Sequence, residues 1–102
     1  MTSEPRLLRR HEQRVPISAQ AQLREPFGRT GEARVANISP SGCMVESPHK
    51  LPLDGASIIV RLPGLQGLEA AVRWREDGKL GFEFSSRLHP AIVDHLAAVH
   101  KR

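Results

Sequence analysis

The sequence predicts a mainly β protein, a six-stranded antiparallel β-barrel followed by a C-terminal α-helix. Short stretches in which apolar and polar residues alternate recur along the chain, and this period of two is typical of half-buried strands. Pro, Gly and Asp-Gly turns separate the stretches, which favours an antiparallel sandwich or a small barrel. Near the C-terminus the hydrophobic period lengthens to that of a helix. We therefore expect one barrel at about 14–84 and a helix at about 88–101.

Six segments carry the strand pattern. The clearest is VPISAQAQL, residues 15–23, in which every second residue is apolar. LEAAVRW (68–74) and KLGFEF (79–84) alternate in the same way, and the Asp-Gly pair between them suits a hairpin turn. The three other predicted strands are EARVANI (32–38), GCMVES (42–47) and ASIIVRL (56–62).

The C-terminal segment has the spacing of an amphipathic helix. Its apolar residues fall on one helical stripe: Leu88, Ile92, Leu96 and Val99. Pro90 suits the first turn, where a helix needs no N–H donor. At the other end of the chain, residues 1–8 are expected to form a flexible arm. The folded domain is then 9–102.

Length, charge and cysteine content narrow the class of protein. A chain of 102 residues suits a single domain. No apolar run approaches the roughly 20 residues that span a bilayer, so we expect no membrane insertion. The N-terminus lacks the apolar core of a signal peptide, and the lone Cys43 cannot form an internal disulfide, which suits the cytoplasm. A net charge of +4, supplied mostly by arginine, favours anionic partners.

The segment RRHEQR, residues 9–14, concentrates positive charge directly before the first predicted strand. Arg10 and Arg14 are four positions apart, and Arg9 lies beside them. Guanidinium groups bind phosphate oxygens in pairs, bond to the O6/N7 edge of guanine and stack on bases. Taken alone, the segment fits a solvated basic arm as well as part of an anion site.

A second short segment, NISPSG at 37–42, has the composition of a turn. Asn, Ser and Gly at strand ends commonly satisfy local backbone groups, so the segment predicts a tight turn between the second and third strands. The same residues offer ligand chemistry. The Asn37 carbonyl can accept from the N1–H or N2–H of a guanine, and the Ser39 hydroxyl can bond to a phosphate or a base. Gly42 allows a sharp turn and the close approach of a ligand.

Together the two segments resemble the PilZ domain family. Arg10 and Arg14 match its Arg-x-x-x-Arg segment before the first strand. Asn37, Ser39 and Gly42 match its Asp/Asn-x-Ser-x-x-Gly segment some twenty residues later. The position of Asn37 is often Asp in the family, so a charged acceptor is absent here. The resemblance extends over nearly the whole chain.

This resemblance implies a bacterial receptor for cyclic di-GMP. In the family the arginines hold phosphates and guanines, and the turn segment contacts a guanine from the barrel surface. The residues implied as ligand contacts are Arg9, Arg10, Arg14, Asn37, Ser39 and Gly42. Because Arg9 directly precedes the first motif arginine, the sequence resembles family members that bind two stacked ligand molecules in place of one. The arm would become ordered on the ligand and change a surface presented to a downstream partner protein that the sequence does not name.

Two other functions stay open at this point. A basic barrel can bind RNA or single-stranded DNA through stacking aromatics. Nucleic acid is the less favoured partner because Trp74, Phe82 and Phe84 are expected in the core. A PilZ-like adaptor that binds only protein is the other alternative. No acid–base or nucleophile constellation predicts an enzyme, no His or Cys spacing predicts a metal site, and no cofactor is expected. We expect a monomer or a weak homodimer.

Overall fold

The computed structural model describes residues 13–25, 28–46 and 57–101. Residues 1–12, which include the predicted flexible arm with Arg9 and Arg10, lie outside the described residues. The elements within the described ranges are β1 (Val15–Arg24), β2 (Thr30–Ser39), β3 (Gly42–Glu46), β4 (Ser57–Arg61), β5 (Leu68–Glu76), β6 (Lys79–Phe84) and α2 (Pro90–Val99).

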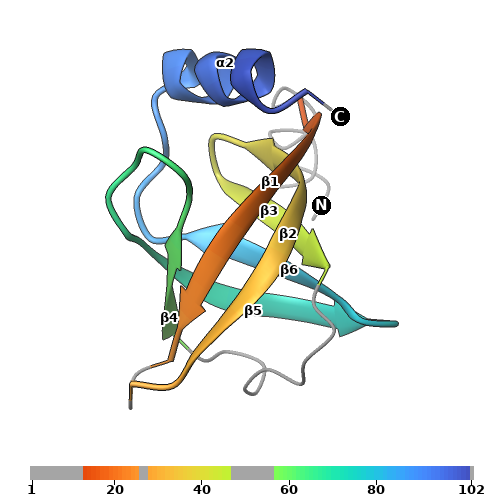
Figure 1. Cartoon of the computed structure of the whole chain (residues 1–102), viewed down its shortest axis with the longest axis vertical. Helices are drawn as coiled ribbons and strands as arrows, with labels where there is room; N and C mark the ends of the chain where they lie inside the picture. Colours follow the sequence, from red (N-terminus) through yellow and green to blue (C-terminus); the bar gives the residue numbers. More distant parts are fainter. Residues whose placement is uncertain (1–12, 26–27, 47–56, 102) are drawn as a thin grey trace, which may run out of the picture.

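The six strands form a closed antiparallel barrel, which confirms the predicted fold (Figure 1). The strand order around the barrel is β1-β2-β3-β6-β5-β4, and every neighbouring pair is antiparallel. β1 pairs with β2 from Val15 to Arg24, with an interruption between Pro16 and Ala19, but with β4 only at Gln22–Arg24. α2 lies across the end of the barrel where β1 begins and where β2 turns into β3 (Figure 1).

The core fills the inside of this barrel. In β1 the predicted alternation holds, since every second residue is buried and those between are exposed. The buried residues of β1 are Ile17, Ala19, Ala21 and Leu23. α2 adds Val93 and Leu96, which cover one end of the core. The apolar pattern of the β1 sequence therefore predicts correctly which face of the strand points inward.

α2 is shorter than predicted at both ends. It begins at Pro90 because His89 caps it, with the His89 Nδ1 accepting from the Ala91 N–H at 3.0 Å. Leu88 is buried, but it lies in the irregular segment before the helix. Val99, expected on the apolar stripe, is 58% exposed at the last turn. No helix in the described part of the chain is long and apolar enough to cross a membrane.

One core assignment is wrong. Phe82 and Phe84 are buried as predicted, but Trp74 is 39% exposed. The pairing of β5 with β6 shifts register between Val72 and Trp74, so the strict alternation of β5 ends there. As a result all residues from Arg73 to Glu76 are exposed. The irregularity places the indole on the outer surface of the barrel.

Candidate functional site

The structure joins the two motif segments by a direct side-chain contact. Arg14 immediately precedes β1, and the ladder pairs Pro16 of β1 with Asn37 near the end of β2. The Arg14 Nη1 donates to the Asn37 Oδ1 at 2.9 Å. Two positions that are 23 residues apart in sequence therefore form one polar surface.

A local irregularity in the β2–β3 ladder turns Asn37 outward. The register shifts between Val35 and Asn37, and both Val35 and Ala36 are buried while Asn37 is half-buried. Without the extra residue, alternation would direct Asn37 into the core. Its amide is oriented by two neighbours, since Oδ1 faces Arg14 and Nδ2 lies 3.9 Å from the Met44 Sδ on β3. The amide oxygen keeps a second lone pair with which it can accept from a ligand.

Ser39 lies inside the turn between β2 and β3. Ser39 pairs with Gly42, so Pro40 and Ser41 make the turn between them. The Ser39 side chain is fully buried, with Oγ 3.4 Å from the Ser41 Oγ and 3.5 Å from the Gly42 carbonyl oxygen. These long contacts brace the turn from within. Direct contact between the Ser39 hydroxyl and a ligand stays a prediction.

The close packing of two strand backbones explains why position 42 is a glycine. A Cβ built there would lie 2.1 Å from the Phe82 carbonyl oxygen on β6, a contact that no side chain can make. Gly42 is also buried, and it pairs with Glu83. The glycine therefore lets β3 and β6 approach each other directly behind the motif turn.

Four of the six predicted ligand residues are described, and they lie in one region. Arg14 and Asn37 are in contact, and Ser39 and Gly42 form the ends of the turn that follows. Arg9 and Arg10 lie outside the described residues, so their part in the site stays a prediction.

A row of residues across the barrel extends the site and was missed from the sequence. The ladders pair Asn37 with Met44, Met44 with Gly81, and Gly81 with Trp74. The Trp74 indole covers Gly81, because a Cβ there would lie 2.1 Å from Nε1. The available signal was Gly81 itself, since a glycine at an outward position of KLGFEF leaves room for a large cross-strand ring.

The arginines near this row differ in the partners to which they bond. Arg34 pairs with Glu46 between β2 and β3, and Arg73 pairs with Glu83 between β5 and β6. Each of these arginines has an acidic partner that offsets its charge. Arg14 instead bonds to a neutral amide, which leaves its positive charge uncompensated by that partner. Within the described residues, the site therefore offers a cation to an incoming anion.

Cys43 lies directly behind this surface, on the inner side of β3. Burial raises the pKa of its thiol from 9.0 to about 12, and the positive charge of Arg14 offsets part of that increase. The thiol is thus neutral at ordinary pH and is a core side chain. Among the described residues no group of three or more His, Cys, Asp and Glu side chains is placed to hold a metal ion.

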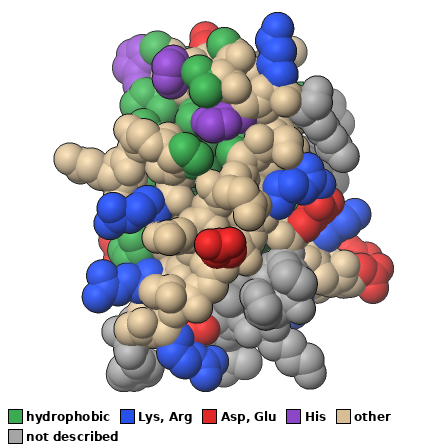
Figure 2. All heavy atoms as spheres, viewed as in Figure 1, with side chains coloured by type: hydrophobic (Ala, Val, Ile, Leu, Met, Phe, Trp, Pro, Cys, Tyr) green, Lys and Arg blue, Asp and Glu red, His purple; other side chains and the backbone are tan. Residues whose placement is uncertain are grey.

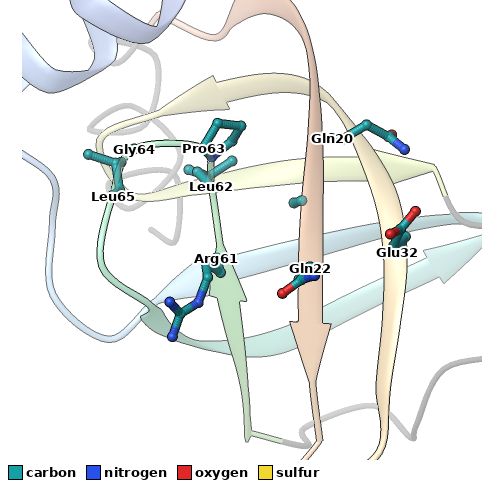
Figure 3. Close-up of a pocket in the computed structure, with 9 residues that line it drawn as sticks. Gln20, Gln22, Glu32, Arg61, Leu62, Pro63, Gly64 and Leu65 are labelled. Carbon is teal, nitrogen blue, oxygen red and sulfur yellow. The ribbon is translucent and has the colours of Figure 1, made fainter.

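A separate groove of about 400 Å³ lies over the middle of β1 (Figure 3). Its polar residues are Gln20 and Gln22 of β1, Glu32 of β2 and Arg61 of β4, and the turn 62–65 forms one side (Figure 3). None of the four predicted ligand residues that the structure describes lines it. The groove is therefore distinct from the Arg14–Asn37 surface.

Comparison with known proteins places the chain among barrels of the same kind. The PilZ domain of YcgR from Escherichia coli, in a structure with c-di-GMP, matches with a TM-score of 0.66 and 16% identity, covering 90% of this chain and 88% of that chain. The PilZ domain of CeSA from a cellulose-synthesizing bacterium matches with a TM-score of 0.60 and 16% identity, covering 84% of this chain and 91% of that chain. None of the curated proteins compared with the chain matches it.

At such low identity, the structural likeness establishes the fold alone. The sequence evidence is broader, because the PilZ domain family model matches residues 8–99. That range includes the segment before β1, the whole barrel and all of α2. The chain therefore belongs to the PilZ domain family.

Proposed function

We propose that this chain is a receptor for cyclic di-GMP that acts by binding and not by catalysis. The observation that carries the proposal is the 2.9 Å contact between Arg14 and Asn37, which unites the two motif segments on one face of a PilZ barrel. The YcgR domain, which shares this fold, has a structure with c-di-GMP. The positive charge of Arg14, which bonds to the neutral amide of Asn37, suits the phosphates of such a ligand.

Each motif residue has a role in this proposal. Arg14 binds a phosphate or the O6/N7 edge of a guanine, and Asn37 accepts from the guanine N1–H or N2–H. Arg10 supplies a second guanidinium from the preceding segment. Arg9 decides whether one or two stacked ligand molecules bind. Ser39 and Gly42 hold the turn in the shape that presents Asn37.

The proposed output is a change in the segment before β1. We propose that Arg9 and Arg10 close over the bound ligand and that the new surface contacts a downstream partner protein. Arg14 is the point from which this closure starts, since it is already fixed to the barrel by Asn37. Binding would thus shift a conformational equilibrium through contacts that exist only in the bound state.

Isothermal titration calorimetry with cyclic di-GMP tests the proposal. Wild-type protein should bind at micromolar concentration, and Arg10→Ala and Arg14→Ala should each weaken binding at least about tenfold, as expected for a lost charge-assisted bond of about 1.5–3 kcal/mol. Arg61→Ala is the matched control, because Arg61 is an exposed arginine in the separate groove. No heat with wild type, or equal losses in all three variants, would defeat the proposal.

One observation favours the nucleic-acid alternative. Trp74 is exposed between Arg73 and Arg75, an arrangement that single-strand binders use for stacking and backbone contact. Arg73 is already paired with Glu83, which reduces its availability for phosphates. Titration with oligonucleotides of increasing length separates the two functions. Affinity that rises with length and falls steeply with salt would favour nucleic acid over a cyclic dinucleotide.

A further inference from the structure

The segment that leads into α2 is attached to the motif turn. The Leu88 N–H donates to the Pro40 carbonyl oxygen at 2.8 Å, and the Phe84 N–H donates to the Ser41 carbonyl oxygen at 2.8 Å. Both acceptors belong to the turn between Ser39 and Gly42. The position of the backbone before α2 therefore depends on the position of this turn.

The other end of α2 is attached to the start of β1. The Ser18 N–H donates to the His100 carbonyl oxygen at 2.9 Å, and Lys101 forms a bridge with Ile17. Both partners on β1 lie within four positions of Arg14. Figure 1 shows the result, with α2 spanning from the β2–β3 turn to the beginning of β1.

Besides these bonds, α2 is held by a small apolar contact with the core, to which the partly buried Ile92 and Ala97 contribute. Only Val93 and Leu96 of its ten residues are buried. Figure 2 shows histidine and hydrophobic side chains gathered on the surface over α2. An isolated helix of this length is unstable in water, so its stability depends on its attachments to the barrel. Those attachments belong to the same two segments that carry the ligand residues.

We infer that the docking of α2 is energetically coupled to the ligand site. This inference rests on the proposed function and deepens it, because it names α2 as the element that responds to cyclic di-GMP. A ligand that bonds to Arg14 and Asn37 restrains the start of β1 and the end of β2. The bonds from Ser18 and Leu88 then open less often, and α2 stays docked. By linkage, loss of α2 docking must weaken ligand binding by the same factor.

Amide hydrogen exchange followed by NMR gives the first test. Saturating cyclic di-GMP should slow exchange at Ser18, Leu88 and Leu96 at least about fivefold, which is the lower end of measured couplings. Val60 on β4 serves as the control, because β4 contains none of the motif residues. A ligand that binds by calorimetry but leaves these three amides exchanging at the free rate overturns the coupling and leaves the receptor function intact.

Substitutions in α2 give the reciprocal test. Leu96→Ala removes a buried side chain, and it should weaken binding of cyclic di-GMP at least about fivefold although no ligand residue changes. Val99→Ala is the control on the same helix, since Val99 is 58% exposed. If Leu96→Ala does not fold, the half-buried Ile92 gives the milder variant Ile92→Ala. Wild-type affinity in a variant whose helix exchanges faster overturns the inference.

The coupling between α2 and the motif turn can also be tested without ligand. If cyclic di-GMP gives no heat in calorimetry, the receptor proposal fails, but this test of the coupling still applies. In the ligand-free protein, Leu96→Ala should still speed amide exchange at Asn37 and Ile38, because the turn loses its bonds to the α2 segment. Unchanged exchange at those two amides would overturn the coupling independently of any ligand.

Discussion

The indole of Trp74 occupies the space that a side chain at Gly81 would fill, since a Cβ there would lie 2.1 Å from Nε1. Gly81 pairs with Met44, and Met44 pairs with Asn37, so the ring stands in the same cross-strand row as the partner of Arg14. Neighbouring strands are about 4.8 Å apart. Because the ring covers Gly81, it adjoins Met44 and lies about two strand spacings from Asn37.

Cyclic di-GMP should therefore change the fluorescence of Trp74, the only tryptophan of the chain. A dinucleotide seated on Arg14 and Asn37 is large enough to reach Met44 and to alter the polarity around the indole. We expect a saturable change in emission whose midpoint agrees with calorimetry. Arg14→Ala should shift that midpoint to higher ligand concentration. If calorimetry detects binding but the emission stays constant, the ligand lies near Arg14 and does not reach the Trp74 end of the row.

Gly81→Ala should move the indole into solvent. The new methyl group meets the pyrrole edge of Trp74 and a ring cannot yield by bending, so it must rotate away from β6. The expected result is a red shift of tryptophan emission in the folded, ligand-free protein, with a loss of stability of about 1–3 kcal/mol from overpacking. Gly67→Ala, in the loop before β5, is a control that leaves Trp74 untouched. Unchanged emission in Gly81→Ala would contradict the stacking of Trp74 on Gly81.

The bond between Arg14 and Asn37 should contribute little to folding and much to binding. Both groups are near the surface, so a double-mutant cycle of Arg14→Ala and Asn37→Ala in urea should give a coupling of about 0.5 kcal/mol, the low end for a hydrogen bond. The same variants should lose at least about tenfold in affinity for cyclic di-GMP. A coupling energy of several kcal/mol in the free protein would show that the pair serves mainly to stabilise the fold.

The barrel was predictable because its core residues follow simple alternation. β1 shows this most clearly, and its buried residues are those that the sequence pattern selects. Asn37 and Trp74 each lie next to a register shift, which local alternation does not reveal. Asn37 was identified through its motif, whereas Trp74 had no motif and was assigned to the core. The burial of Ser39 depends on the packing of the turn against the rest of the barrel, which a single segment cannot encode.

Gly42→Ala should destabilise the protein by about 2 kcal/mol or more, because the new Cβ meets the backbone carbonyl of Phe82 and neither strand can move freely. Gly67→Ala is the matched control. Its Cβ would lie 2.6 Å from the Ile59 Cγ2, a methyl branch of a half-buried side chain, and so it would meet a side chain in place of the backbone. Reduced entropy of the unfolded chain offsets that cost by about 0.4–1 kcal/mol. Equal losses in urea unfolding would show that the approach of β3 to β6 is not the reason for Gly42.

Cys43 should make the protein less stable in alkali. Burial holds the pKa of its folded-state thiol at about 12, against 9.0 for an ordinary thiol, while the charge of Arg14 acts weakly in the opposite direction. Below pH 9.0 the thiol is neutral in both states and its contribution to stability is fully present. As the pH rises from 9.0 towards 12, only the unfolded chain loses the proton, so the free energy of unfolding falls by up to about 1.4 kcal/mol per pH unit.

Urea unfolding of wild type and Cys43→Ala between pH 8 and pH 10.5 isolates this contribution. The chain has no tyrosine, so lysine is the other side chain that titrates in the range, and it is common to both proteins. The free energy of unfolding should fall with pH more steeply in wild type than in Cys43→Ala, with the two slopes diverging above pH 9. Parallel slopes would mean that the thiol ionises as readily in the folded barrel as in the unfolded chain. That result would contradict its burial behind the Arg14–Asn37 surface, where it is 0% exposed.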